Sequence, residues 1–156
     1  MCDYSLMGLP NRMAHEGEDL VVCRFGTGSQ GLTSPEDFRK ATDTAQTRPT
    51  NFRSLLKSFF GGLKTDHMVA VCIPPGARLL LGDISEYAQH SFNVGSTEEV
   101  TFTEITARPN TYRDAVRFKN GHELLLQRLN QGQRVRVLQL SLQDEPVRSV
   151  GKLTGV

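Results

Sequence analysis

Short apolar runs, separated by residues that favour turns, follow one another along much of the chain. Apolar and β-branched residues recur in them, in several cases alternating with polar ones, which is typical of short β-strands with one buried face. The runs are residues 19–25, 67–73, 77–84, 99–105, 112–118, 122–129 and 134–140. The pattern predicts about six strands joined by short connections.

Two of the connections carry strong turn signals. Pro74-Pro75-Gly76 places proline before glycine, the order favoured at the centre of a type II turn. Lys119-Asn120-Gly121 places Asn-Gly between two apolar runs, which is the strongest short signal for a β-hairpin. The polar stretch at 85–96 lacks such a pattern, and we expect it to be irregular.

The glycine-rich segment after the first run, GTGSQG at 26–31, matches the dinucleotide-binding pattern GxGxxG. That site requires a helix that begins inside the motif and a parallel strand that ends in an acidic residue. Here Thr33, Ser34 and Pro35 follow the last glycine before any helix can begin. The segment therefore predicts a turn rather than a nucleotide site, and we expect no cofactor.

Two segments have the features of helices. Ser34 is a suitable N-cap for a helix over 34–41, with Pro35 at its first position, and the polar residues 42–49 are expected to form a loop. In 51–62, five large apolar residues repeat with helical spacing, and we expect this face to pack against the sheet rather than bind a membrane. They are Phe52, Leu55, Leu56, Phe59 and Phe60.

These elements predict a mainly β (α+β) fold, an antiparallel β-barrel or sandwich of about six strands with one or two short helices. The chain of 156 residues is long enough to bury a core without disulfides or metals. Residues 1–141 are expected to form a single β-rich domain, and residues 142–156 a polar, loosely ordered C-terminal tail.

The composition is that of an ordinary water-soluble protein, with 38% hydrophobic and 22% charged residues. The start of the chain has no leader-like basic and apolar segments, and no apolar run approaches the roughly 18 residues that span a bilayer. We therefore expect no membrane partner and a cytoplasmic location. The thiols of Cys2, Cys23 and Cys72 are expected to be reduced there.

Charge is unevenly distributed along the chain. Residues 1–106 carry nine Lys/Arg and thirteen Asp/Glu, whereas residues 107–156 carry nine and four. If 112–118 and 134–140 are strands, their basic residues lie on the face opposite the apolar ones. The candidates for binding a polyanion such as nucleic acid are Arg113, Arg117, Lys119, Arg134 and Arg136. No aromatic residue alternates with them, so the stacking platform of single-strand binders is missing.

Histidines and cysteines do not show the spacing of a metal site, since the chain has no CxxC, HxH or HExxH motif. We therefore expect no metal. The chain also has no GxSxG elbow, so the sequence gives no indication for or against conventional hydrolase chemistry. Cys23 and Cys72 lie within apolar runs, where a thiol is expected to behave as a small hydrophobic group.

Cys2 is the candidate for covalent chemistry. Removal of Met1 would place its thiol beside a free α-amine, a pair that can supply a nucleophile with an internal base, trap an aldehyde or ligate a metal. Asp3 disfavours the thiolate, and Arg12 or His15 would have to offset that charge. The abasic-site-binding SRAP-type proteins likewise begin Met-Cys and use this cysteine. The alternative is a second residue without any chemical role.

The N-terminal part of the chain is distinctive in four segments: CDYSLMGLPNR, EGEDLVV, RFGTGSQGL and SPEDF. Together they resemble a group of small bacterial proteins that begin MCDYSL and have no assigned function. The resemblance covers mainly residues 2–35 and implies a bacterial, cytoplasmic origin, with no functional residue to carry over. Two hypotheses of function remain. The first is a small soluble binding or interaction module of unidentified ligand, and the alternative is an enzyme or covalent trap that uses Cys2 as its nucleophile.

Overall fold

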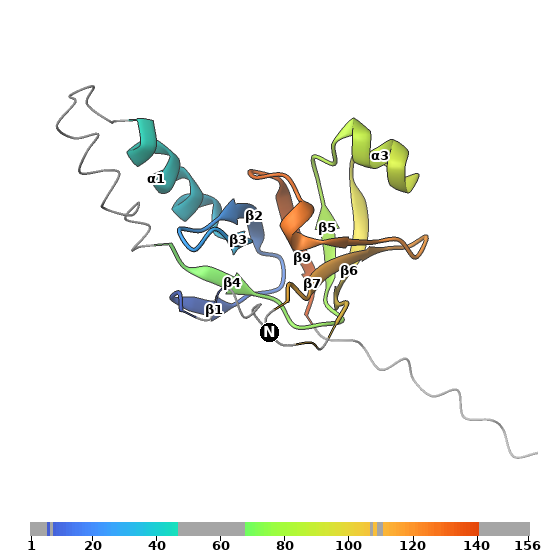
Figure 1. Ribbon diagram of the computed structural model, residues 1–156, viewed down its shortest axis with the longest axis horizontal. Coiled ribbons are helices and arrows are strands. Elements are labelled where there is room, and N and C mark those ends of the chain that lie inside the picture. The colour runs from blue at the N-terminus through green and yellow to red at the C-terminus, as the bar shows by residue number, and fades with distance from the viewer. Residues whose placement is uncertain (1–5, 7, 47–67, 107, 109–110, 141–156) are drawn as a thin grey trace, which may run out of the picture.

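The computed structural model describes residues 6, 8–46, 68–106, 108 and 111–140. In these residues the chain is mainly β (Figure 1). The strands are β1 (Asn11–Met13), β2 (Asp19–Arg24), β3 (Gln30–Thr33), β4 (Ala70–Cys72), β5 (Arg78–Leu81), β6 (Glu98–Glu104), β7 (Asp114–Phe118), β8 (Glu123–Leu125) and β9 (Arg134–Gln139). The helices are α1 (Pro35–Gln46), α3 (Glu86–Phe92) and the 3₁₀ helix η2 (Leu126–Arg128).

Seven strands form one antiparallel sheet in the order β3-β2-β9-β5-β6-β7-β8. Among the described strands the edges β3 and β8 do not pair with each other, so the sheet is not closed into a barrel. Side-chain hydrogen bonds nevertheless join β3 to η2, because the Gln127 amide bonds to the main-chain N–H and C=O of Gln30 at 2.8 and 2.7 Å. The prediction of a mainly β fold is therefore confirmed, in the form of an open, curled sheet.

A second, two-stranded sheet pairs β1 with β4 in parallel. The pairing is extended by the N–H of Ala14, which donates to the Cys72 carbonyl at 3.0 Å. A buried threonine joins this small sheet to the large one, since the Thr33 hydroxyl donates to the Val69 carbonyl at 2.9 Å. The sequence pattern did not predict β1, whose three residues have no apolar run.

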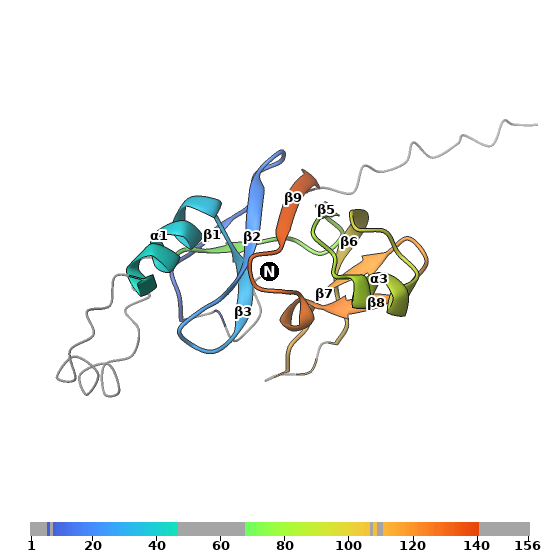
Figure 2. The ribbon, with the colours of Figure 1, turned by 90° about the horizontal axis from the view of Figure 1, so that it is seen from above.

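The core has two parts, because β2 is buried on both of its faces. The main part fills the inner face of the large sheet and includes Leu20, Val22, Leu79, Leu81, Val100, Phe102, Val116 and Val137. The smaller part lies on the other face of β2, between the sheet and α1, and includes Leu6, Cys23, Phe25, Met68 and Ala70. Figure 2 shows α1 and α3 at opposite ends of the sheet.

The two helices differ from the prediction in length and in place. α1 continues through 42–46, where the sequence predicted a loop. Phe38 and Ala41 pack against the smaller core, and the chain has no glycine or proline to stop the helix before Pro49. The expected N-cap is confirmed, because the Ser34 hydroxyl accepts the Asp37 N–H at 3.1 Å.

Helix α3 lies within the stretch expected to be irregular. The Ser85 hydroxyl caps it by accepting the Ala88 N–H at 3.4 Å, and Asn93 ends it in the left-handed conformation with φ 52°. Ala88 and Phe92, one helical turn apart, pack against the main core. This mixed polar sequence therefore forms an amphipathic helix of only two turns, which its pattern did not predict.

Two strand predictions also need correction. Residues 30–33, expected to belong to a glycine-rich turn, form β3, since Gln30 and Thr33 satisfy their buried polar groups through hydrogen bonds. The run at 122–129, expected to be one strand, is β8 followed by η2. This bend brings Gln127 to the edge of β3.

The turns predicted at 74–76 and 119–121 are confirmed. The Ala77 N–H donates to the Pro74 carbonyl at 3.2 Å and Gly76 has a φ of 90°, as a type II turn requires. Gly121, with a φ of 90°, closes the hairpin between β7 and β8. The predicted helix at 51–62 and the predicted tail at 142–156 lie outside the described residues.

Candidate functional site

The outer face of the large sheet carries most of the basic residues singled out in the sequence. Arg117, Lys119, Arg134 and Arg136 are exposed, whereas their neighbours in sequence on β7 and β9 are buried. The predicted alternation is confirmed in β9, whereas in β7 Asp114, Ala115 and Val116 are all buried. The structure brings the four basic side chains to one face. Arg113 precedes β7 and is half-buried.

Carboxylates pair with all four of these cations. Arg134 binds Asp83 at 2.7 and 3.0 Å, and Arg136 binds Asp19 at 2.7 and 2.8 Å. On the neighbouring strands, Arg117 lies 2.7 Å from Glu123 and Lys119 lies 3.3 Å from Glu99. Arg78 of β5 shares Glu99 with Lys119. The face is therefore a mixed-charge surface rather than a positive one.

These pairs also set the ionisation of their carboxylates. The hydrogen bond from Arg136 lowers the pKa of Asp19, and the hydrogen bond from Arg134 lowers the pKa of Asp83. The pKa of Glu99 is lowered in the same way by Arg78. All three groups therefore stay ionised around neutral pH, and a polyanion would have to displace them to reach the arginines.

Of the two proposed partners of Cys2, Arg12 is engaged with another group. Arg12 forms a two-point ion pair with Glu18, one contact of which is 3.1 Å, and the main-chain N–H of His15 donates to the same carboxylate at 2.9 Å. The His15 side chain is exposed. Cys2 itself lies outside the described residues, so its nucleophilic role stays a prediction.

The two strand cysteines differ from each other. Cys23 is free and 3% exposed, and burial raises its pKa to about 11, so it is a poor nucleophile at neutral pH. Cys72 is disulfide-bonded, and its partner is not among the described residues. The expectation of a reduced thiol is therefore wrong for Cys72.

A pocket of about 270 Å³ lies between α3 and the inner face of the sheet, next to η2. Its walls come from α3 with the loop before it, from the β7–β8 hairpin, and from η2 with the loop after it. The lining residues are Leu81, Ile84, Ser85, Tyr87, Ala88, Ser91, Phe92, Phe118, Leu124, Arg128, Leu129, Asn130 and Gln133.

The floor of the pocket is apolar and belongs to the main core. Phe118, Leu124 and Leu129 are each less than 10% exposed, at 2%, 9% and 5%. Above them, α3 presents Ser85 and Ala88 at helical spacing, and no residue of α3 is fully buried. Small side chains on this side of the helix leave the space that larger ones would fill.

The rim of the pocket is polar. Arg128, Asn130 and Tyr87 are exposed there, and Tyr87 keeps 82% of its surface in solvent. Gln133 is 4% exposed, and both ends of its amide are used within the fold: it donates to the Gly82 carbonyl at 2.9 Å and accepts the Asn130 N–H at 3.1 Å. Gln133 therefore shapes the pocket, while Arg128 and Asn130 can contact a ligand.

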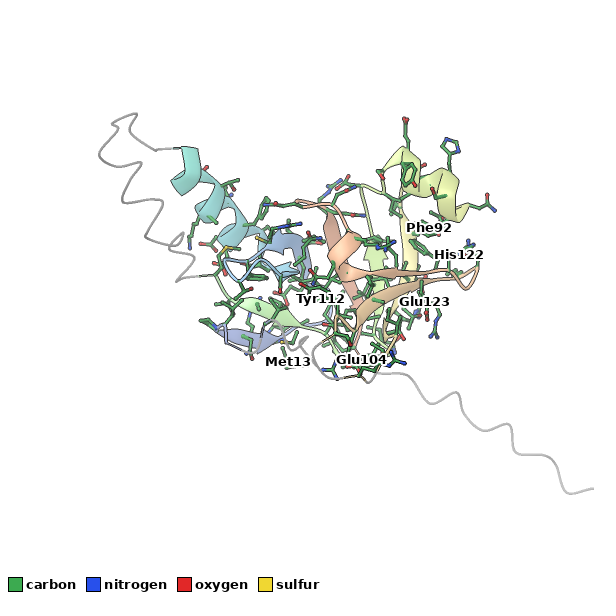
Figure 3. All side chains as sticks on the ribbon, in the orientation of Figure 1. Met13, Phe92, Glu104, Tyr112, His122 and Glu123 are labelled. Atoms are coloured by element: carbon green, nitrogen blue, oxygen red, sulfur yellow. The ribbon has the colours of Figure 1, made fainter. Side chains whose placement is uncertain are left out.

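The C-terminal end of α3 is fixed to the β7–β8 hairpin. The rings of Phe92 and Phe118 stack with centroids 5.9 Å apart, and the Asn120 side chain donates to the Phe92 carbonyl at 2.7 Å. The His122 ring lies 5.8 Å from that of Phe92, and Figure 3 shows these two side chains beside each other at the hairpin. The pocket is thus held open by a helix anchored at this end.

This pocket could not be predicted without α3, which the hydrophobic pattern of the sequence does not indicate. The signals that could have found the helix are Ser85 at its start, Glu86 in its first turn and Asn93 at its end, all of which suit a short capped helix. Arg128 was also overlooked, because the run that contains it was taken for a continuous strand.

Among the described residues that line the pocket, the polar ones are Ser85, Tyr87, Ser91, Arg128, Asn130 and Gln133. Its lining contains no Asp, Glu, His or Cys that could act as an acid, base or nucleophile. In the part of the chain that the structure describes, no three His, Cys, Asp or Glu side chains gather in a way that could hold a metal ion. None of the described helices has the length and apolar character needed to cross a membrane.

Comparisons of the chain with protein-family models, with curated proteins and with solved structures found no match.

Proposed function

We propose that this protein is a small binding module that takes a small ligand into the pocket beneath α3. The observation that carries the proposal is the combination of a buried apolar floor with a polar, solvent-facing rim in one concave site. Ligand sites in proteins are typically apolar pockets with a few polar groups placed at their edge. The bacterial, cytoplasmic origin implied by the N-terminal resemblance is part of this proposal.

Binding accounts for the described residues better than covalent chemistry at Cys2. The free thiol among them, Cys23, is buried and has a raised pKa. Arg12, the cation nearest Cys2 in the sequence, already neutralises Glu18. The covalent alternative therefore gains no support from Arg12.

Two-dimensional amide NMR during a screen of small fragments tests the proposal. We expect fragments to shift the amides of Ala88, Leu129 and Asn130, and to raise the melting temperature by mass action. The variant Ala88→Leu places a larger side chain in the pocket and should weaken these fragments about tenfold or more. His90→Ala, on the same helix but outside the pocket lining, is the matched control. Fragment binding that Ala88→Leu leaves unchanged would place the site elsewhere.

A further inference from the structure

We infer that the ligand of this pocket is a small carboxylate with an apolar body, and that Arg128 binds its carboxylate. The inference rests on the proposed function, because it names the class of ligand that the same site takes. It is carried by the charge of the rim, by the hydrogen-bonding groups left there, and by the size of the apolar floor.

The charge of the pocket comes from one residue. Arg128 is the charged member of the described lining, and no carboxylate accompanies it. Within the described part of the chain Arg128 makes no ion pair or side-chain hydrogen bond, although it is exposed at the end of η2. Arg117, Arg134 and Arg136 on the outer face all hold carboxylates. An uncompensated guanidinium beside an apolar cavity favours an anionic ligand.

Hydrogen-bond donors beside Arg128 fit the same ligand. The Asn130 side chain makes no hydrogen bond within the described residues, and its main-chain groups are already bonded to Gln133. The Ser85 hydroxyl accepts the Ala88 N–H, which leaves its own proton to donate. A carboxylate accepts hydrogen bonds and donates none, so these groups complement Arg128.

The volume limits the apolar part of the ligand. At about 270 Å³ the pocket lies at the lower end of the range of roughly 300–1,000 Å³ found for drug-sized ligands. Its floor of Phe118, Leu124 and Leu129 offers no polar atom of a side chain. A single aromatic ring or a short branched chain with one carboxylate matches this space, whereas a nucleotide is too large and a sugar phosphate has no apolar body to contact the floor.

Binding measurements with phenylacetate and 2-phenylethanol test the inference. The two probes share the apolar body, and only the first carries a carboxylate. We expect phenylacetate to shift the amides of Ala88, Leu129 and Asn130 and to bind about tenfold more tightly than 2-phenylethanol, with an affinity that falls as salt is added. Arg128→Gln should weaken phenylacetate about tenfold and leave 2-phenylethanol unchanged. Arg24→Gln is the matched control, because it removes an exposed arginine outside the pocket.

The outcomes separate this inference from the proposed function. Equal binding of the two probes at the same amides, or phenylacetate binding that Arg128→Gln does not weaken, would overturn the carboxylate inference and keep the pocket as a binding site. Failure of both probes and of the fragment screen to shift the lining amides would overturn both.

Discussion

At the scale of single residues, Cys23 shows how burial changes chemistry. It lies in the middle of β2, 3% exposed, on the side of the sheet that α1 covers. Its apolar surroundings disfavour the thiolate, which raises its pKa to about 11 from the usual 9.0. At neutral pH the thiolate fraction is therefore about a hundredfold below that of a free cysteine.

This shift predicts how the thiols react. In native protein near neutral pH we expect iodoacetamide to modify Cys23 at least about a hundredfold more slowly than a cysteine peptide, with a rate that rises as the pH approaches 11. Cys72 should take the label only after reduction, because it is disulfide-bonded. Mass-spectrometric mapping of the labelled peptides, with and without reductant, measures the labelling rates of Cys23 and Cys72 and compares the rate of Cys2 with them.

Two results would contradict these expectations. One is labelling of Cys23 in the folded protein at the rate of the free peptide, and the other is labelling of Cys72 without reductant. The expectation that Cys2 is the most reactive thiol stays a prediction, which the same maps test. Because the chain has three cysteines and Cys23 is free, peptide mapping without reduction also tests whether Cys2 is the partner of Cys72, in which case Cys2 would take the label only after reduction.

The pair of Arg12 and Glu18 predicts acid sensitivity. The hydrogen bond from Arg12 lowers the pKa of Glu18 below 4.5, with a further contribution from the His15 N–H. A carboxylate whose pKa is lower in the folded state than in the unfolded state stabilises the protein at pH values above its unfolded-state pKa. That stabilisation is lost as the pH falls through its folded-state pKa. Glu18→Gln should cost about 1 kcal/mol at pH 7 and little below the folded pKa.

Urea unfolding at several pH values measures this difference. Glu36→Gln is the matched control, because Glu36 pairs with Lys40 on the exposed surface of α1, where solvent screens the interaction. A loss of stability in Glu18→Gln that stays the same as the pH is lowered from 7 through the acidic range would show that the ion pair does not stabilise the fold.

At the scale of elements, two glutamines hold the edges of the sheet together. Gln30 of β3 is 3% exposed, and its side chain donates to the carbonyls of Leu126 and Leu129 at 3.1 and 2.6 Å. Gln127 returns two hydrogen bonds to the main chain of Gln30. The curvature of the sheet and the position of η2, and with it Arg128, therefore depend on side chains that a hydrophobic pattern does not register.

Removal of this link should be costly. Gln30→Ala leaves two buried carbonyls without their partner, and we expect it to lower the free energy of unfolding by about 2–3 kcal/mol. Gln127→Ala loses the bonds to an edge strand and should cost about 1–2 kcal/mol. Gln131→Ala, at an exposed position in the following loop, should change stability very little. Denaturant unfolding measures the series, and a Gln30→Ala variant as stable as Gln131→Ala would refute the link.

At the scale of the whole molecule, the outer face of the sheet is close to electrically balanced. Its five cations are Arg78, Arg117, Lys119, Arg134 and Arg136, and they meet four carboxylates: Asp19, Asp83, Glu99 and Glu123. Electrostatic attraction of a polyanion depends on uncompensated charge, which this face nearly lacks. Three basic residues of the last third of the sequence, Lys119, Arg134 and Arg136, are thus paired with acidic residues from the first two thirds.

We therefore expect the protein not to bind short DNA or RNA in fluorescence anisotropy at low salt. The double variant Glu99→Gln, Glu123→Gln releases Arg78, Arg117 and Lys119 from their partners. It should bind with a Kd on the order of 10⁻⁵ M that weakens steeply with salt. Glu36→Gln, Glu86→Gln makes the same change in net charge away from this face and should not bind. Salt-sensitive binding by the unmodified protein would instead support the polyanion interface predicted from the sequence.

The strands that carry the main core could be predicted from the sequence. Alternation of buried and exposed positions in β9, and the glycines of the turns at Gly76 and Gly121, are local properties that follow from the period of a strand and from the φ that each turn requires. The burial of Cys23 followed from its apolar neighbours in the same way. These features need no knowledge of distant contacts.

Other features were decided by contacts between residues far apart in the chain. Gln30 forms a buried strand because Gln127, Leu126 and Leu129 supply its hydrogen bonds. Likewise, α3 is a helix where its short polar sequence gives a weak signal, since Phe92 stacks on Phe118 and Asn120 binds its last carbonyl. The pocket exists only where these elements meet.

The sequence by itself determined the chemical character of the strands: which faces are apolar, where the chain turns, and which residues carry charge. Only the tertiary structure decided whether a charge is free or paired, because the carboxylates that neutralise Arg134 and Arg136 come from Asp83 and Asp19, far away in the chain. It also left Arg128 beside an apolar cavity without such a partner among the described residues. Pairing depends on distance in space, which a linear pattern of residues does not contain.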